Sequence, residues 1–311
     1  MSPEIKFIFF QLVIVGPFFL GFIGKKKFPE LSGASKKMVT FNLAVLEPPI
    51  ILWSIWGLSL TPEMAALPVF GLFMVVVGFF LGKIAAPLLD LSFKGRKTFV
   101  ISASLANHGF TMGGFICYLI SGETGLALSS IFLIYFIPFT FLFLFAYAGL
   151  DGKNRFSLKT VAGFFLTLKN MPLLAVLIAL ALNLMEVRRP LFVFPTDALL
   201  ILSVGLYYLT LGITFEPVDL KPFERHHGVI AMEKFVVIPL LVSLVSGILP
   251  VTPEIKQVVL IQSFMPAAIY SVVTSIIFDL DSRLASSLFV VNSLLFILIV
   301  FPVLVWLGRS I

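Results

Sequence analysis

Residues 97–120 read KTFVISASLANHGFTMGGFICYLI, a stretch that is apolar on both sides of a polar, glycine-rich centre at residues 107–114. Residues 256–278 read KQVVLIQSFMPAAIYSVVTSIIF and are interrupted in the same way at residues 262–266. Glycine is a poor helix former and proline lacks a backbone donor, so both centres favour local unwinding. Asn107 and Pro266 each lie roughly 14 Å along their helices, close to the middle of a hydrocarbon core about 30 Å thick. The two stretches therefore predict two transmembrane helices that are broken at mid-membrane.

The composition around these stretches excludes a soluble protein. The chain has 311 residues, of which 59% are hydrophobic and 12% are charged, and its mean hydropathy is +1.09. A soluble domain has about 45–50% apolar and about 25% charged residues. The net charge of +6 would suit nucleic acid, but the basic residues lie between apolar runs. We therefore expect an integral membrane protein with no soluble domain and no nucleic-acid partner.

Charged residues divide the chain into ten stretches, each about long enough to cross a membrane. Fifteen of the 22 Lys and Arg residues lie in loops after odd-numbered stretches, whereas the termini and the other loops hold five. Basic loops stay in the cytoplasm. We therefore expect both termini outside the cytoplasm, in a plasma membrane or, in a bacterium, the inner membrane. The stretches are 5–23, 38–60, 64–89, 98–120, 124–149, 171–187, 194–215, 228–249, 256–278 and 284–308.

An internal repeat relates the two halves of the chain. When the two quoted stretches are aligned from their first lysines, Asn107 falls opposite Pro266. Five stretches per half is an odd number, so the second half crosses the membrane upside down relative to the first. We therefore expect inverted repeats at residues 1–150 and 151–311, a construction typical of secondary transporters. Chance similarity between apolar segments is the alternative explanation.

The paired breaks predict a substrate site. The N-terminal ends of half-helices carry free N–H groups and partial positive charge, which suits a carboxylate. Asn107 can donate and accept hydrogen bonds beside them. The alternative is structural: polar side chains hydrogen-bond one helix to another, and the glycines permit close packing. The candidate substrate-binding residues at the breaks are Asn107, Gly109, Gly113, Gln262, Ser263 and Pro266.

Short motifs along the whole chain resemble the auxin efflux carrier family, which includes plant PIN-type auxin exporters and bacterial malonate or malate permeases. The residues that carry the resemblance are an N-x-G-F-x-x-G segment (Asn107, Gly109, Phe110, Gly113), a G-x-x-G-L turn (Gly122, Gly125, Leu126), Asn170-Met171-Pro172, an L-x-x-G signature (residues 209–212), Pro266-Ala267, Ala285-Ser286 and Asn292-Ser293. The chain departs from the family at Gly114, where a proline is usual, and at Glu47 and His108. These departures concern the substrate more than the fold.

The resemblance implies an all-α membrane fold of ten helices in two inverted five-helix repeats. Its fourth and ninth helices are broken and cross, similar to bile-acid/sodium symporter-like folds. Stretches one, two, six and seven would form a scaffold and a homodimer surface, and the other six a moving transport unit. The family carries organic anions, and its P-A crossover adds Ala267 to the candidate substrate-binding residues.

Ionisable residues inside the stretches are functional candidates because burying a charge is costly. Glu47 lies near mid-depth before two prolines, where it would either carry a proton or make a structural ion pair or hydrogen bond. His108 beside the first break would either titrate or simply pack. Lys83 and Glu233 occupy equivalent stretches and are expected to pair, unless Lys83 reaches outward to the interface. Lys234 could reach outward in the same way, and a structural role is expected for both lysines.

The sequence favours a secondary transporter for a small organic anion, with membrane lipid and a second copy of the chain as further partners. A channel, or a membrane receptor or sensor without transport, is the alternative. A channel would carry polar stripes along several helices, whereas polarity here gathers at two breaks. No phosphate-binding loop, paired carboxylates or Cys/His cluster is present, so we expect no enzyme activity, no cofactor and no metal.

Overall fold

The computed structural model describes residues 3–28, 30–149, 171–215 and 224–307. In these ranges the chain is helical apart from turns and one isolated bridge between Ala106 and Ala267. Seven of their helices are long and apolar enough to cross a membrane, and Met171–Leu184 is a shorter apolar helix. The prediction of an all-helical integral membrane protein is therefore confirmed. The predicted boundary between repeats, at residues 150 and 151, lies outside the described residues.

The first half of the chain forms long helices linked by short turns. α1 is apolar and ends at three lysines, whose positive charges favour the negative end of a helix. α2 and α3 form one span because the π-helical turn between them, Asn42–Leu46, keeps the chain helical. The bounds are α1 Pro3–Lys27, α2 Leu31–Phe41, α3 Glu47–Trp56, α4 Ala66–Ala85, α5 Phe93–Ser104, α6 Gly113–Phe132, α7 Phe136–Pro138 and α8 Phe145–Gly149.

The second half has a similar alternation of helices and π-helical turns. Glu233–Val237 joins α12 to α13, and Phe296–Val300 joins α16 to α17. The bounds are α10 Met171–Leu184, α11 Thr196–Thr214, α12 Glu224–Met232, α13 Ile238–Ile248, α14 Pro253–Ser263, α15 Ile269–Ile277, α16 Ser282–Leu295 and α17 Phe301–Leu307.

Both predicted helix breaks are present, with shifted limits. Residues 105–112 separate α5 from α6, and residues 264–268 separate α14 from α15. Gly113 begins α6 and does not belong to the break. Gln262 and Ser263 are the last residues of α14. Proline disrupts the turn before it rather than an entire segment, which explains why the helix persists up to Ser263.

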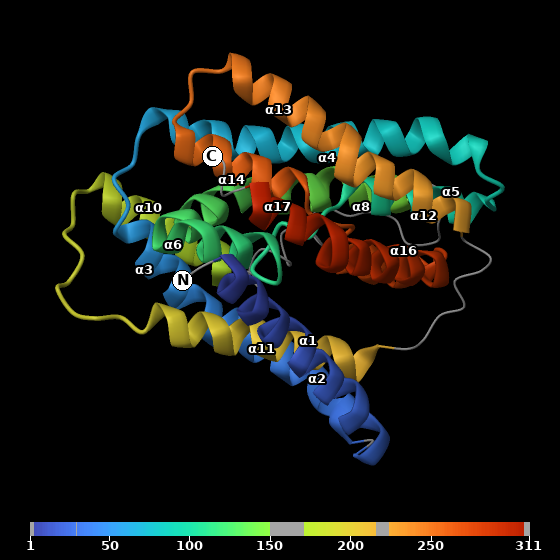
Figure 1. Cartoon of the computed structure of the whole chain (residues 1–311), viewed down its shortest axis with the longest axis horizontal. Helices are drawn as coiled ribbons and strands as arrows, with labels where there is room; N and C mark the ends of the chain where they lie inside the picture. Colours follow the sequence, from blue (N-terminus) through green and yellow to red (C-terminus); the bar gives the residue numbers. More distant parts are fainter. Residues whose placement is uncertain (1–2, 29, 150–170, 216–223, 308–311) are drawn as a thin grey trace.

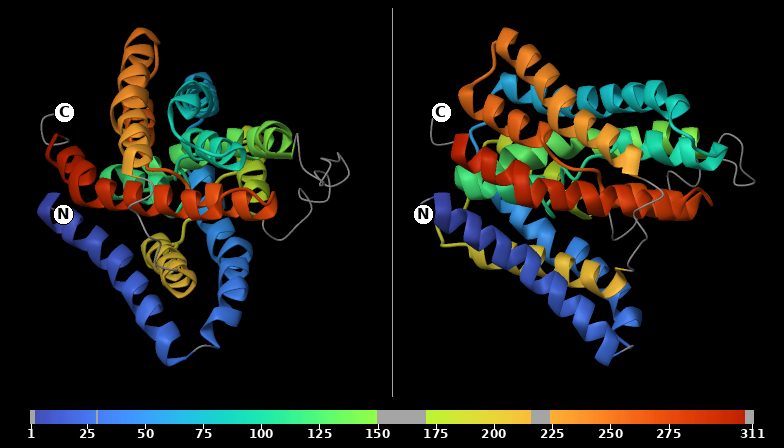
Figure 2. Two further views of the ribbon diagram at one scale, coloured as in Figure 1. Left: turned by 90° about the vertical axis from the view of Figure 1, so that its right-hand side faces the viewer. Right: turned by 45° about the vertical axis from the view of Figure 1, so that its right-hand side comes forward.

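The helices pack in two groups. In the first group α1 lies along α11, α3 packs against α10, and α2 contacts α11. In the second group α4 packs on α5, α6 and α14, and α16 packs on α5, α12 and α15. Contacts of α6 with α3 and α11 join the two groups. Figures 1 and 2 show α1, α2 and α11 together on one side of the molecule.

The two ends of this helical assembly are distinct. At one end, on the right in Figure 1, α1 ends and α2 begins, close to Lys25 and Lys36. We call this end the basic face. At the opposite end, which we call the far face, α3 ends and α11 begins. The start of α1 and the end of α17 lie together on the far-face side (Figure 2).

Lys83 and Glu233 do not form the expected pair. The Lys83 ammonium lies 5.8 Å from the ring centroids of both Phe79 and Tyr147. Such cation–π contacts suit an exposed lysine at the edge of an apolar surface. Glu233 is buried instead beside Lys234.

Candidate functional site

The two helix breaks cross each other through backbone hydrogen bonds. The Asn107 N–H donates to the Pro266 carbonyl at 2.8 Å, and the Ala268 N–H donates to the Leu105 carbonyl at 3.2 Å. These bonds create the antiparallel bridge between the two breaks. Backbone polar groups deep in a membrane protein need hydrogen-bond partners within the protein. Here each break donates one backbone hydrogen bond to the other. The crossing therefore fixes two unwound segments at one point.

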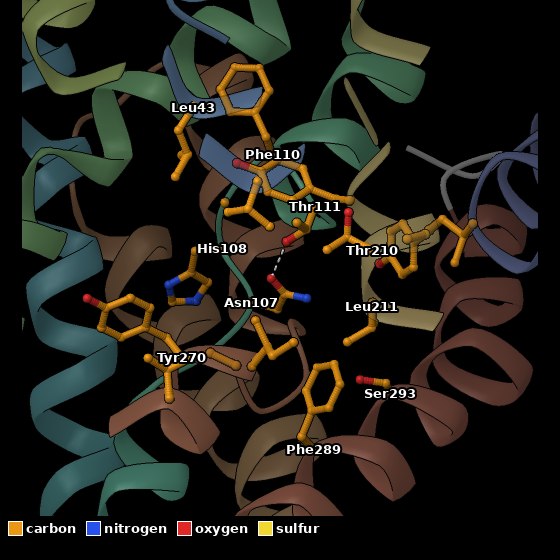
Figure 3. Close-up of a pocket in the computed structure, with 18 of the residues that line it drawn as sticks. Leu43, Asn107, His108, Phe110, Thr111, Thr210, Leu211, Tyr270, Phe289 and Ser293 are labelled. Carbon is orange, nitrogen blue, oxygen red and sulfur yellow. Dashed lines mark hydrogen bonds between the residues drawn. The ribbon is translucent and has the colours of Figure 1, made fainter. Parts of the chain in front are cut away.

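A cavity of about 950 Å³ lies against this crossing, between the two helix groups (Figure 3). Four of the predicted site residues line the cavity: Glu47, Asn107, His108 and Gly109. Ser35 and Lys36 at the start of α2, and Thr214 and Phe215 at the end of α11, also line it. The cavity thus extends from the crossing toward the basic face.

Asn107 offers a polar group to the cavity in a defined orientation. The Thr111 hydroxyl donates to Asn107 Oδ1 at 2.5 Å. In Figure 3 the amide nitrogen of Asn107 points away from Thr111, toward Thr210 and Leu211. The side chain is oriented to donate a hydrogen bond to a molecule in the cavity, as a carboxylate would require.

The other predicted site residues do not line the cavity and instead support the crossing. Gln262 Nε2 donates to the His108 carbonyl at 3.2 Å, and the Ala267 N–H donates to Asn292 Oδ1 at 3.3 Å. A Cβ atom on Gly113 would collide with the Gln262 amide. Ser263 donates within its own helix, to the Leu260 carbonyl at 2.6 Å. Pro266 contributes the carbonyl that accepts from Asn107.

The His108 imidazole is fixed by contacts with Tyr135 and Phe132. Its Nδ1 lies 2.5 Å from the Tyr135 hydroxyl, and its ring meets Phe132 edge-on at 5.1 Å. The side chain is 2% exposed. A ring nitrogen that is hydrogen-bonded and an imidazole that is packed between aromatic rings are typical of a fixed, structural histidine.

Glu47 faces the cavity from the opposite helix group. The π-helical turn before it and the prolines Pro48 and Pro49 after it loosen the helix at this depth. The carboxylate is 5% exposed and lines the cavity. Tyr207 on α11 lines the cavity as well and interacts with this carboxylate. Glu47 and Lys36 are the formally charged side chains that line the cavity within the described residues.

Most residues of the cavity wall were not predicted from the sequence. One wall is a face of α11 formed by Tyr207, Thr210, Leu211 and Thr214. Their spacing of three and four residues is the signal that could have revealed it, because such residues share one helix face. Figure 3 shows further lining side chains: Leu43, Phe110, Tyr270, Phe289 and Ser293.

Lys234 does not reach outward to the membrane interface, which the sequence allowed. The side chain is 1% exposed, and its ammonium donates to the Ala103 carbonyl. α5 ends one residue later, so Ala103 belongs to the last turn, whose carbonyls lack helical partners. The ammonium therefore satisfies a carbonyl at the break.

Within the described ranges, no three or more His, Cys, Asp or Glu side chains are grouped to hold a metal ion.

Two comparisons with known proteins concern the chain as a whole. Residues 12–307 match the family described as membrane transport protein. An uncharacterized transporter of Methanocaldococcus jannaschii is 28% identical over 231 residues, which cover 71% of this chain and 71% of that protein.

Proposed function

Because the chain belongs to the membrane transport protein family, we propose that it is a secondary transporter that carries a small organic anion by alternating access. The family match also confirms the resemblance to auxin efflux carriers and indicates a transporter rather than an enzyme. The observation that carries the proposal is the cavity at the crossing of two broken helices, into which Asn107 directs its amide. Discontinuous helices at mid-membrane are where secondary transporters bind substrate.

The proposed architecture is ten spans in two inverted repeats. α5, the first break and the part of α6 before Gly122 correspond to the predicted fourth span, and α14 and α15 to the ninth. The group of α1, α2, α3, α10 and α11 is the scaffold and the dimer surface in this proposal, and the remaining helices are the transport unit. The start of α1 and the end of α17 lie on one side, which supports an even number of spans. The basic loops support a cytoplasmic location for the basic face in this proposal.

The cavity chemistry favours an anion with one charged group and an apolar body. Asn107 and the first residues of α15, Ile269 and Tyr270, line the cavity. First-turn amides have no partner within their own helix and attract negative charge. Aromatic side chains such as Phe110 and Phe289 cover much of the remaining wall. We therefore expect monocarboxylates to bind more tightly than dicarboxylates.

Glu47 is the group that we propose for proton coupling. Its carboxylate shares the cavity with the anion, so a charged Glu47 repels the substrate and a protonated one does not. Binding of an anion then favours uptake of a proton from the same side. His108 was the other candidate, but its contacts with Tyr135 and Phe132 favour a structural role.

A channel is the competing function, and the structure favours a carrier. The cavity reaches the basic face, whereas the far face is crossed by contacts between the two helix groups. A site open to one side at a time is the requirement for alternating access. A conducting pore would instead present polar groups along the whole path.

Thermal unfolding of the purified protein with a panel of mono- and dicarboxylates tests the proposal. A ligand at 100 times its Kd adds about 2.7 kcal/mol to the free energy of unfolding, enough to raise the midpoint by several degrees. Asn107→Ala should remove most of this ligand-dependent rise. Gln257→Ala is the matched control, because Gln257 contacts Ser121 outside the cavity. A ligand response that survives Asn107→Ala unchanged would place the site elsewhere.

A further inference from the structure

Two polar contacts join the helix groups at the far face. Arg189, in the segment between α10 and α11, forms an ion pair with Glu123 of α6. Tyr118 of α6 donates a hydrogen bond to Asp197 at the start of α11. α6 belongs to the group that contains the crossing, whereas Arg189 and Asp197 belong to the other group. We call these four side chains, Tyr118, Glu123, Arg189 and Asp197, the latch.

Arg189 is positioned by the end of α3. Its guanidinium lies 4.7 Å from the Trp53 ring centroid and donates to the Trp53 carbonyl at 3.1 Å. Phe192 and Phe194 pack on the same tryptophan ring, at 4.6 and 4.9 Å between centroids. A Cβ atom on Gly57 would collide with the guanidinium, so the glycine leaves the room that Arg189 occupies. Contacts with the end of α3 therefore position the arginine independently of its ion pair with Glu123.

Glu123 reaches Arg189 because of the residue before it. Gly122 has φ of +63° and ψ of −148°, which interrupts α6. A residue with a side chain rarely adopts this backbone conformation. The resulting turn separates the segment of α6 that follows the crossing from the segment that carries Glu123. The first of these segments carries Tyr118 and follows the unwound segment at Asn107, so it joins the latch to the crossing.

The latch lies at the opposite end of the molecule from the mouth of the cavity. On α11 the lining residues run from Tyr207 to Thr214, and Asp197 precedes Tyr207 by ten residues, roughly 15 Å of helix. On α3, Glu47 and Ile51 line the cavity, whereas Trp53 does not. The same scaffold helices therefore border the cavity near the basic face and hold the latch at the far face.

We infer that the latch closes the far face in the state with the cavity open to the basic face, and that it must break for the site to face the other side. The inference rests on the alternating access proposed above. Relative motion of the two groups changes the distance between Arg189 and Glu123 and between Tyr118 and Asp197, since each pair spans both groups. The ion pair is partly shielded, with side-chain exposures of 31% and 38%.

Cysteine accessibility tests the inference. A Cβ atom on Gly109, at the cavity wall, would meet nothing within 4 Å, so Gly109→Cys in a Cys117→Ser background reports which face reaches the cavity. A membrane-impermeant maleimide is applied from the far face to intact, oriented vesicles. We expect slow labelling of this parent protein, and faster labelling by roughly three- to tenfold in Glu123→Gln or Asp197→Ala, because weakening one state shifts the population to the other.

Charge exchange and a matched control complete the test. The double variant Arg189→Glu with Glu123→Arg should label more slowly than either single variant, because the ion pair is restored. Lys94→Gln removes an exposed ion pair of 2.5 Å with Asp279 inside one helix group, and should label at the parent rate. Parent-like labelling of Glu123→Gln and Asp197→Ala overturns the latch. Fast labelling of the parent from both faces instead overturns alternating access itself.

Discussion

Asn107 shows how a single neighbour sets the chemistry that a side chain offers. An amide has a donor end and an acceptor end, and only the donor end suits an anion. Thr111, four residues along the same break, takes the acceptor end by donating to Oδ1 at 2.5 Å. Both side chains line the cavity. Thr111 is therefore a positioning residue for the proposed anion site.

Removal of the Thr111 hydroxyl should weaken anion binding. Thr111→Val keeps the shape of the side chain but loses a hydrogen bond of about 1 kcal/mol, so the Kd should rise about fivefold. Thr111→Ser keeps the hydroxyl and should bind like the wild type. Titration calorimetry with the carboxylate that stabilises the wild type most is the measurement. Equal Kd values for the valine and serine variants would show that the orientation of Asn107 does not depend on Thr111.

At the residue scale the sequence identified the polar centre of the site but not its wall. Asn107 and Glu47 were found because a polar residue in an apolar stretch is conspicuous and costly. Thr210 and Ser293 were missed because hydroxyl groups can bond to their own helix, as Thr210 does to the Leu206 carbonyl at 2.8 Å. Such residues are common in membrane helices whether or not they face a cavity.

α1 and α11 pack closely along their lengths. This packing depends on a glycine in each helix that lies against the backbone of the other helix. A Cβ atom on Gly212 would collide with the Phe18 carbonyl and lie 2.9 Å from the Phe22 nitrogen. A Cβ atom on Gly21 would collide with the Leu209 carbonyl in the same way. Gly212 ends the L-x-x-G motif in the sequence, and this close backbone approach is the physical reason for a glycine there.

Gly212→Ala should force α1 and α11 apart and destabilise the protein. Overpacking of this kind costs about 1–3 kcal/mol, since backbone atoms cannot turn aside as a side chain can. Gly16→Ala on α1 is the control, because a Cβ atom there would meet nothing within 4 Å and alanine favours a helix. The midpoint of thermal unfolding in detergent should fall for Gly212→Ala and stay level or rise for Gly16→Ala. A similar change in both variants would contradict the close approach.

At the element scale, glycine and proline located both helix breaks to within a few residues. The sequence could not set their limits, because these depend on a partner distant along the chain. The first break begins at Leu105, two residues before Asn107, where the sequence predicted it to begin. Its carbonyl accepts from Ala268 in the other break. Pairing between the breaks, rather than local propensity, therefore determines where each helix stops.

At the scale of the whole molecule, the cavity belongs to neither helix group alone. The crossing provides Asn107 from one group, and α3 and α11 provide Glu47 and Tyr207 from the other. Such a juxtaposition depends on tertiary packing, so no feature of the sequence indicated that Glu47 lies at the same cavity as Asn107. The proposed proton acceptor lies on one group and the proposed anion site on the other, so the two come together only where the groups pack.

This arrangement predicts that a pH gradient drives anion uptake through Glu47. Protonation removes the negative charge that opposes the anion, so acidification of the side that supplies the anion should accelerate uptake into proteoliposomes. Glu47→Gln is permanently neutral and similar in shape, so its uptake should no longer respond to the gradient while the protein still binds the anion. Glu63→Gln, at an exposed turn at the far face, should keep the wild-type response. If Glu47→Gln responds to the gradient as the wild type does, the proton is carried elsewhere, and His108 becomes the next residue to test.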